Sequence, residues 1–261
     1  MSSAIDRLVA ALDAHPRLAL AVSGGVDSMT LAHVAQRLSR TQATMYHACG
    51  PAVPVAARER VERHAREHGW ALVLIDAGEY ADERYRANPL DRCYWCKTNL
   101  YARIRERTTE PIASGTNRDD LGDFRPGLKA AGEHGVVHPY VEAGLTKADV
   151  YALAATLGLA DLERRPAQPC LASPVETGIR IAADDLAFID HVETALAGEL
   201  GGEAVLRCRV THGGVVIELG RDDGDAAAIA RSIGERACAQ AGRSFAGVRP
   251  YARGAAFLHP R

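Results

Sequence analysis

One short segment near the N-terminus constrains the fold more than any other. Ser23-Gly24-Gly25-Val26-Asp27-Ser28 separates the apolar run from Leu18 to Val22 from a helix-like pattern that starts near Met29. A strand that turns at Gly-Gly directly into a helix aims backbone N–H groups and the positive helix end at one point. Glycines let the backbone approach an anion, serine hydroxyls can donate to it, and an aspartate can hold a metal bound to it. The segment therefore predicts a phosphate site, without the spacing or lysine of a Walker A loop.

The composition is ordinary for a globular enzyme with a sizeable core. Of 261 residues, 47% are hydrophobic and 25% are charged, so one large domain, alone or with a small second one, is expected. The formal net charge of -2 argues against a generally basic surface for nucleic acid. No apolar stretch has the length of a signal peptide or of a membrane span of about 20 residues. We expect a cytoplasmic protein with neither a membrane nor a nucleic acid as its partner.

Strands and helices alternate over the first part of the chain. This alternation predicts an α/β fold with a doubly wound parallel sheet. Ligands bind such sheets beyond the carboxyl ends of the strands, where Ser23, Cys49 and the pair Gly115-Thr116 fall. A loop is expected over 123–129, because Pro-Gly continues a helix poorly. The expected strands are 18–22, 44–47, 71–75, 111–116 and 136–139, and the expected helices are 5–15, a helix from 29, 55–68, 95–107 and 147–157.

A change of rhythm after Gly178 marks the expected domain boundary. The preceding segment, 164–174, contains three prolines and cannot be regular structure throughout. We expect residues 1–178 to form the nucleotide-binding domain and 179–261 to form a small α+β domain. In the latter, helices are expected over 183–200 and 224–241, and strands over 204–210, 214–219 and 244–248.

The six cysteines suggest metal ligands, reactive groups or buried thiols rather than disulfides, given the expected reducing compartment. Cys93 and Cys96 form a C-x-x-C pair, and Cys170 lies in the proline-rich segment. Thiolates from two loops can share one metal centre. The residues themselves leave four interpretations open, namely an iron–sulfur site, a redox or persulfide set, a zinc site, or unlinked thiols. The remaining cysteines are expected to pack in the interior: Cys49, Cys208 and Cys238.

Histidines and arginines give weaker signals. The ten histidines show no ligand spacing, and each is expected on the surface or as a satisfied core residue. Arg207 and Arg209 lie two residues apart in an expected strand, so they share one face and could clamp a phosphate. A solvated strand face is the alternative explanation of this pair.

Together these motifs resemble the LarE family of PP-loop ATP pyrophosphatases, which are ATP-dependent sulfur transferases that build the nickel-pincer nucleotide cofactor of lactate racemase. The resemblance implies an adenine nucleotide alpha hydrolase-like fold, Mg²⁺, and cleavage of ATP to AMP and pyrophosphate. It further implies adenylylation of a carboxylate of pyridinium-3,5-biscarboxylic acid mononucleotide, which sulfur then converts to a thiocarboxylate. The matching segments cover almost the whole chain: Ser23 to Ser28, Asp91 to Lys97, Asp119 to Lys129, Lys147, Pro169 to Ser173, and Arg207 to Arg209 with Glu218.

The resemblance also implies roles for single residues. Cys93, Cys96 and Cys170 are similar to the trio of family members in which a [4Fe-4S] cluster holds a sulfide on its open iron. Single-cysteine members instead surrender the sulfur of the residue that matches Cys170. A homo-oligomer is also expected. The other implied roles are ATP binding by residues 23–28 with Gly115 and Thr116, substrate binding by Arg207, Arg209 and Arg125, and a divalent ion on Glu218 and, across a small alignment gap, Glu193.

Two other functions remain as alternatives. Several PP-loop enzymes that thiolate tRNA use similar cysteines; the acidic balance and the small C-terminal domain speak against this function, which needs a basic groove or an RNA-binding domain. A sulfide or cluster carrier that binds a nucleotide only as a regulator would release no pyrophosphate from ATP.

Overall fold

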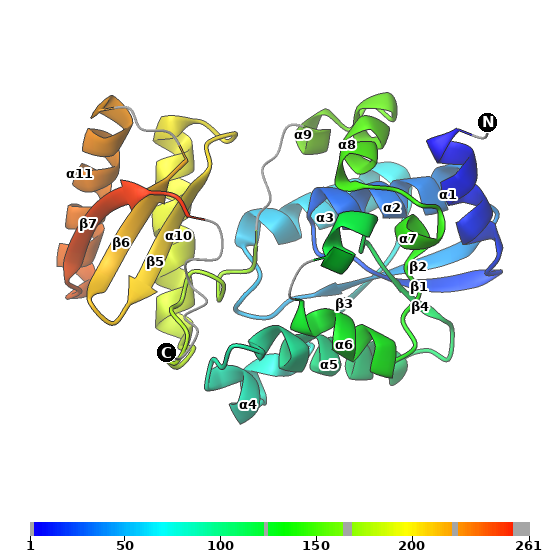
Figure 1. Cartoon of the computed structure of the whole chain (residues 1–261), viewed down its shortest axis with the longest axis horizontal. Helices are drawn as coiled ribbons and strands as arrows, with labels where there is room; N and C mark the ends of the chain where they lie inside the picture. Colours follow the sequence, from blue (N-terminus) through cyan, green and yellow to red (C-terminus); the bar gives the residue numbers. More distant parts are fainter. Residues whose placement is uncertain (1–2, 123–124, 164–168, 221–223, 253–261) are drawn as a thin grey trace. The chain divides into compact units, whose positions relative to one another are not determined.

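The computed structural model describes residues 3–122, 125–163, 169–220 and 224–252. It divides into two compact units, drawn in Figure 1. The first unit comprises Met1–Asp82 with Asp91–Ala167, and the second comprises Glu83–Leu90 with Gln168–Arg261. The boundary expected after Gly178 lies inside the second unit. The chain therefore enters the second unit briefly before it completes the first.

A parallel sheet forms the centre of the first unit. Within the described residues it has four strands in the order β3-β2-β1-β4. Leu20 of β1 is in register with Met45 of β2 on one side and with Ala113 of β4 on the other. Winding reverses between β1 and β4, because the chain runs outward through β2 and β3 before it returns to β4. The strands are β1 Arg17–Ala21, β2 Gln42–Ala48, β3 Ala71–Ile75 and β4 Ile112–Ser114.

Helices flank this sheet, so the predicted parallel α/β architecture is confirmed (Figure 1). Thr146 caps α8 as predicted, since its hydroxyl accepts from the Asp149 N–H while the Asp149 carboxylate accepts from the Thr146 N–H. The helices of the first unit are α1 Ala4–Asp13, α2 Val26–Arg37, α3 Val55–His68, α5 Arg92–Arg105, α6 Pro126–Glu133, α7 Pro139–Glu142, α8 Lys147–Thr156 and α9 Ala160–Glu163, with 3₁₀ turns at Glu79–Ala81 and Arg118–Gly122.

Three local predictions for this unit were wrong. Helix α6 occupies most of the expected loop 123–129, because Pro126 stands at its first position, where proline is favoured. Residues 136–139 form no strand; among the described residues, Val137 makes an isolated bridge to Ala113. Helix α5 begins at Arg92 rather than near residue 95, so the C-x-x-C pair lies on a helix and not in a loop.

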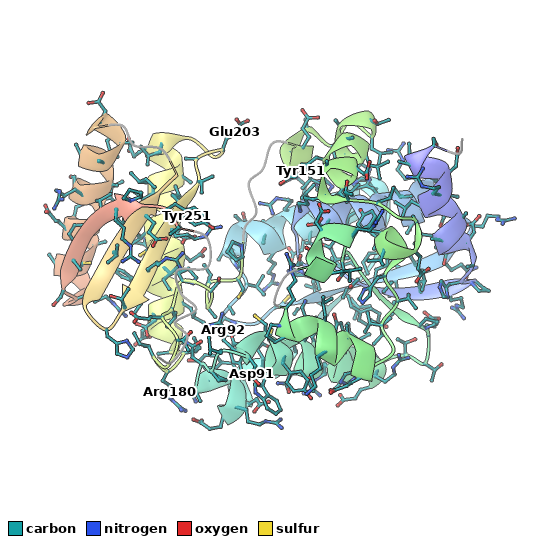
Figure 2. All side chains as sticks on the ribbon, in the orientation of Figure 1. Asp91, Arg92, Tyr151, Arg180, Glu203 and Tyr251 are labelled. Atoms are coloured by element: carbon teal, nitrogen blue, oxygen red, sulfur yellow. The ribbon has the colours of Figure 1, made fainter. Side chains whose placement is uncertain are left out.

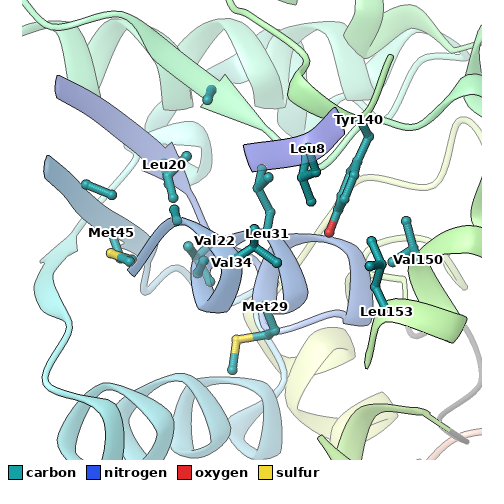
Figure 3. Close-up of a cluster of buried hydrophobic side chains, with 14 of the residues drawn as sticks. Leu8, Leu20, Val22, Met29, Leu31, Val34, Met45, Tyr140, Val150 and Leu153 are labelled. Atoms are coloured by element: carbon teal, nitrogen blue, oxygen red, sulfur yellow. The ribbon is translucent and has the colours of Figure 1, made fainter. Parts of the chain in front are cut away.

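The core beside β1 fixes the position of α2. Figure 3 shows Leu20 of β1, Met29 and Leu31 of α2, and Leu153 of α8 gathered in it. Helix α2 is buried over nearly its whole length, from Val26 to Ala35. A helix covered on all sides has little freedom to shift, so the segment at its N-terminus is held in place.

His33 is part of this buried stretch of α2 and is only 1% exposed. Burial lowers the pKa of His33 to about 3, so its ring is neutral at neutral pH. The neighbouring His68, at the end of α3, also has its pKa lowered by burial. The sequence predicted each histidine on the surface or as a satisfied core residue, and the burial of His33 agrees with the second of these.

The second unit contains a separate sheet. Within the described part of the chain, this sheet has three strands in the order β5-β6-β7, with β5 antiparallel and β7 parallel to β6. Helices α10 and α11 pack on it, as Figure 1 shows. No helix of the described residues is long and apolar enough to cross a membrane. The elements are α4 Glu83–Arg86, α10 Ala183–Leu200, β5 Leu206–Thr211, β6 Gly214–Leu219, α11 Gly224–Ala241 and β7 Phe245–Pro250.

Asn88 ties the early segment 83–90 to the rest of the second unit. Its side-chain amide lies 2.9 Å from the carbonyl oxygens of Glu176 and Ile179 and 3.4 Å from that of Val175. Its backbone is left-handed, with φ of 53°, and its side chain is fully buried. Asparagine is the non-glycine residue best suited to combine this conformation with donation to carbonyl groups.

We predict that Asn88→Ala destabilises the second unit by about 2–4 kcal/mol, because it removes the amide donor and strains the backbone. Asn88→Gly is the matched control, since glycine tolerates positive φ and loses the donor alone. We expect Asn88→Gly to cost about 1 kcal/mol less than Asn88→Ala. Amide hydrogen exchange of β5 and β6 measures both values, and unchanged protection in Asn88→Ala would contradict this role.

Candidate functional site

The turn after β1 presents the N-terminus of α2 at the edge of the sheet where winding reverses. The chain leaves β1 at Ala21, and the Val22 N–H still donates to the Tyr46 carbonyl at 2.9 Å. Gly25 is the N-cap residue of α2 and, being glycine, has no side chain that could cap the helix. The first N–H groups of α2 are therefore available to an anion, as the sequence predicts.

Ser23 and Ser28 brace this turn from within. The two hydroxyl oxygens lie 3.1 Å apart, and Ser28 Oγ also accepts from the Ser23 N–H at 3.0 Å. The Ser28 hydroxyl in turn lies 3.2 Å from the Gly25 carbonyl oxygen. Because Ser28 is buried, its hydroxyl contributes to the shape of the loop.

The two glycines of the turn have different reasons to be there. Gly24 has φ of 86°, and a Cβ on it would lie 2.9 Å from the Ala57 carbonyl oxygen. The buried Arg60 also holds Gly24, since its guanidinium donates to the Gly24 carbonyl at 2.6 Å. A Cβ on Gly25 would meet, among the described residues, the Ser23 hydroxyl at 3.6 Å, which is an ordinary contact. Gly24 is thus required by the fold, whereas Gly25 leaves the space in front of the helix open.

The end of β4 lies directly against this helix. A Cβ on Gly115 would lie 2.9 Å from the Ser28 backbone nitrogen, so the sequence-predicted residues Gly115 and Asp27 are brought together by backbone contact. Thr116 follows, and its hydroxyl lies 3.0 Å from the Ser114 hydroxyl. Ser114 also bonds to His138 Nδ1 at 2.9 Å, and burial lowers the pKa of His138, which keeps that ring neutral.

Asp27 is the point on which the polar groups of this site converge. One carboxylate oxygen accepts from the Asn117 amide at 3.2 Å, and the other forms an ion pair with Lys147 at the start of α8. The Tyr140 hydroxyl donates to the Asp27 carbonyl at 2.9 Å. The Lys147 ammonium lies 5.1 Å from the ring centre of Tyr151, which is labelled in Figure 2. The sequence placed Asn117 at a polar strand end expected to face the nucleotide but gave no role to Tyr140, because only the fold brings Tyr140 to Asp27.

Cys93 and Cys96 lie in the first two turns of α5, just after Asp91 and Arg92, which are labelled in Figure 2. Their spacing of one helical turn puts both thiols on one face, and both residues are half-buried. Helix α6 packs on α5 here, since a Cβ on Gly127 would lie 3.6 Å from the Cys93 carbonyl oxygen. The other sequence-predicted residue of this region, Arg125, forms an ion pair of 2.7 Å with Asp120.

The remaining sequence-predicted site residues belong to the second unit. Cys170 is exposed there, and its carbonyl accepts from the Ser173 N–H at 2.9 Å. Arg207 and Arg209 on β5 are 9% and 5% exposed, so a solvated strand face does not explain them. The Arg209 guanidinium lies 2.6 Å from the fully buried Glu218 carboxylate.

Two carboxylates of this unit were predicted to hold a divalent ion. Glu218 also pairs with Arg249, so each of its oxygens contacts a guanidinium group. Glu193 accepts from the Cys208 N–H at 2.9 Å, and burial raises the pKa of its carboxyl group. Their ion-binding role stays a prediction.

The other cysteines pack as predicted. Cys208 and Cys238 are buried, and burial raises the pKa of both thiols. Cys49 is half-buried at the end of β2 with its sulfur 3.8 Å from the His47 carbonyl oxygen, and burial raises its pKa as well. All six cysteines lie in the described residues and are thiols rather than disulfides.

No protein-family model matches the chain. Individual proteins are nevertheless similar to it in sequence. An uncharacterized protein of Synechocystis sp. is 35% identical over 189 residues, which are 69% of this chain and 68% of that protein. The tRNA-cytidine(32) 2-sulfurtransferase of Syntrophotalea carbinolica is 30% identical over 220 residues, 71% of this chain and 80% of that enzyme.

The chain belongs to the PP-loop family of sulfurtransferases. A LarE-like member of this PP-loop family is also similar: the pyridinium-3,5-bisthiocarboxylic acid mononucleotide synthase of Lactiplantibacillus plantarum is 29% identical over 194 residues. The alignment covers 72% of this chain and 70% of that synthase. The turn from Ser23 to Ser28 is the predicted PP-loop of the chain.

For the PP-loop we predict opposite outcomes at the two adjacent glycines. Gly24→Ala should destabilise the first unit by about 2–4 kcal/mol, because alanine is strained at positive φ and would press on the Ala57 carbonyl. Gly25→Ala should stay within about 0.5 kcal/mol of the parent. Denaturation followed by tryptophan fluorescence reports on this unit, which contains Trp70 and Trp95. Equal destabilisation by both changes would disprove this division of roles.

Proposed function

We propose that this PP-loop sulfurtransferase uses ATP to adenylylate a carboxylate of pyridinium-3,5-biscarboxylic acid mononucleotide and then converts the acyl adenylate to a thiocarboxylate. The observation that carries the proposal is the meeting of Asp27, Lys147 and the uncapped N-terminus of α2 at one sheet edge. The choice of substrate is supported by the relative from Lactiplantibacillus plantarum, whose name specifies the bisthiocarboxylic product.

The first step needs a place for departing pyrophosphate. A carboxylate oxygen of the substrate attacks the α-phosphorus of ATP, the bond to the bridging oxygen breaks, and pyrophosphate carries away the electron pair. The N–H groups at the start of α2 and the Lys147 ammonium are the donors suited to hold that anion. Asp27 supplies the carboxylate that would bind Mg²⁺. When bound, Mg²⁺ offsets the charge that develops on pyrophosphate.

The second step needs sulfur, for which we propose Cys93, Cys96 and Cys170. The first two fit a cluster site, since their half-buried thiols lie on one face of α5. Three cysteine ligands leave one iron of a [4Fe-4S] cluster open, and the cluster would supply a sulfide there. In this scheme Cys170 serves as a ligand and is not consumed. In the competing scheme the Cys170 thiolate attacks the acyl carbon and AMP leaves. Loss of the Cα proton then breaks the Cβ–S bond, so the sulfur stays on the product as a thiocarboxylate and Cys170 becomes dehydroalanine.

The mononucleotide phosphate requires a cationic partner, which we assign to Arg207, Arg209 and Arg125. Arg207 and Arg209 are buried on one strand face, and guanidinium groups bind phosphate with paired hydrogen bonds. A divalent ion on Glu218 would have to displace Arg209 or Arg249 from its carboxylate. We therefore favour a positioning role for Glu218, which holds the Arg209 guanidinium in place.

A second candidate function is the thiolation of tRNA. It is favoured by the 30% identity to the tRNA-cytidine(32) 2-sulfurtransferase, which equals the identity to the LarE-like relative within one per cent. Both functions share the activation step at the PP-loop and differ in the acceptor. The acceptor that triggers pyrophosphate release therefore decides between them.

We predict that the protein releases pyrophosphate when it is given both ATP and the biscarboxylated mononucleotide. Lys147→Ala should lower this rate by about 10²-fold, because it removes the positive charge that stabilises the departing pyrophosphate. Arg40→Ala is the control, since Arg40 is exposed and paired with Asp13 at the far end of α2. Its rate should stay within about twofold of the parent. Release with unmodified tRNA but not with the mononucleotide would replace the proposal by the second candidate. If neither acceptor triggers pyrophosphate release, the remaining hypothesis is a sulfide or cluster carrier that binds a nucleotide only as a regulator.

For the sulfur donor we predict that anaerobic reconstitution with iron and sulfide gives a broad visible absorbance that Cys93→Ala, Cys96→Ala or Cys170→Ala abolishes. Cys49→Ala is the matched control and should keep the band. Mass spectrometry of the protein after turnover should show an unchanged mass. Loss of the elements of H₂S from Cys170 would instead establish the sacrificial scheme, and a band that persists in all three variants would disprove the cluster.

A further inference from the structure

Three histidines of the first unit form a group that neither the PP-loop nor the cysteines explain. His33 lies on α2, and His64 and His68 lie on α3. Each offers a ring nitrogen, and these three nitrogens lie within 4.8 Å of one another. The expectation that the histidines show no ligand spacing was wrong: residues 64 and 68 are four apart on one helix, which places both rings on the same face.

We propose that His33, His64 and His68 bind one divalent transition-metal ion of the Zn²⁺ type. Three neutral imidazoles are a common ligand set for zinc and leave a fourth position for water. The site is independent of the proposed sulfur transfer, because it shares no residue with the PP-loop or the cysteine trio.

The ligand atoms are already close to the spacing that such an ion requires. His33 Nε2 lies 2.9 Å from His64 Nδ1. Ligand nitrogens of a tetrahedral zinc site, each about 2.0–2.1 Å from the metal, are roughly 3.3 Å apart. An ion can therefore replace the hydrogen bond between these two rings with a small opening of the pair. The third ring, His68, has its centre 4.3 Å from that of His33 and 5.6 Å from that of His64.

Asp161 orients the central ring for this task. Its carboxylate lies 2.9 Å from His64 Nε2, and Arg63 pairs with the same carboxylate at 2.5 Å. A carboxylate accepts, so Nε2 carries a proton, and the lone pair that would bind a metal ion would be on Nδ1, the atom that faces His33. A carboxylate behind a histidine is the usual second partner of a metal-bound imidazole, which it orients and makes more basic.

The surroundings are those of a site open at one side. His33 and His64 are buried, while the His68 side chain is 25% exposed and marks the side from which an ion enters. The Trp70 ring packs 5.1 Å from His33 and 5.9 Å from His64. Its indole N–H is buried and makes no hydrogen bond within the described structure, so this region holds a polar group whose partner is still to be found.

A metal ion at this place would join α2 to α3. The α2 ligand lies in the same helix as Asp27 and Ser28 of the PP-loop, about one and a half turns further along. The ion would thus fix the helix that carries the phosphate site without touching the phosphate. Its role would be structural, because it would hold the two helices together.

Titration of the full-length protein with Co²⁺ tests the proposal. We expect about one equivalent to bind with the visible d–d absorption of a tetrahedral nitrogen site and without the near-ultraviolet band of thiolate ligation, which separates this site from the cysteines. Zn²⁺ should displace the Co²⁺ and raise the thermal midpoint of unfolding.

Variants locate the ion. His68→Ala removes the most exposed ligand and should fold, and we expect it to weaken Zn²⁺ binding at least about 10-fold; Asp161→Asn should weaken it by about 10-fold through His64. His191→Ala, which alters a histidine of the second unit, is the matched control and should bind as the parent does. The proposal is overturned if the parent binds no Co²⁺ with nitrogen ligation, or if His68→Ala binds Zn²⁺ with unchanged affinity. The three rings would then form only a hydrogen-bonded chain from His33 through His64 to Asp161.

Discussion

The first unit depends on one close approach, that of the end of β4 to the first turn of α2. At Gly115 the backbone of one element lies so near the backbone of the other that no side chain fits between them. This approach is possible because β1 and β4 are neighbours in the sheet, and the helix that follows β1 starts beside the end of β4. Backbone contact of this kind holds the uncapped N–H groups of α2 in a fixed direction, so the predicted anion site would be a property of the fold.

The polar groups around Asp27 use the same rigidity. Asn117, Tyr140 and Lys147 come from three separate segments after β4, and each reaches Asp27. A carboxylate that is held by an amide and an ammonium group is already oriented before any ligand arrives. Preorganisation of this sort lowers the free-energy cost of ordering these side chains when a phosphate binds. All four of these residues belong to the first unit, so the activation site that we propose is built from one unit alone.

Much of this arrangement could be predicted from the sequence, and the reasons for the failures are specific. Helices 55–68, 183–200 and 224–241 and strands 71–75 and 214–219 were predicted with the observed bounds. The apolar residues of strand 214–219 are buried in the structure, whereas strand 71–75 was recognised by its apolar run although most of it is not buried. Helix α6 was missed since Pro126 was taken as a breaker although it stands at a helix start. Two of the three histidines of the proposed metal site, His64 and His68, lie four residues apart in the sequence, but His33 joins them only in the folded chain. Nothing local marks Asn88, whose acceptors lie more than 80 residues away in the chain.

The early excursion of the chain into the second unit has a consequence for synthesis. Residues 83–90 leave the ribosome when the remainder of their own unit, from Gln168, is still untranslated. At a synthesis rate of about 5–20 residues per second, roughly 4–16 s pass between the emergence of residue 90 and that of Gln168. All four strands of the first sheet emerge before Gln168 does. The Asn99 amide, which bonds to Asp82 at 2.8 Å, fixes one end of the waiting segment to the first unit. The first unit can thus fold during translation with this segment as a surface loop, and the second unit closes around it last.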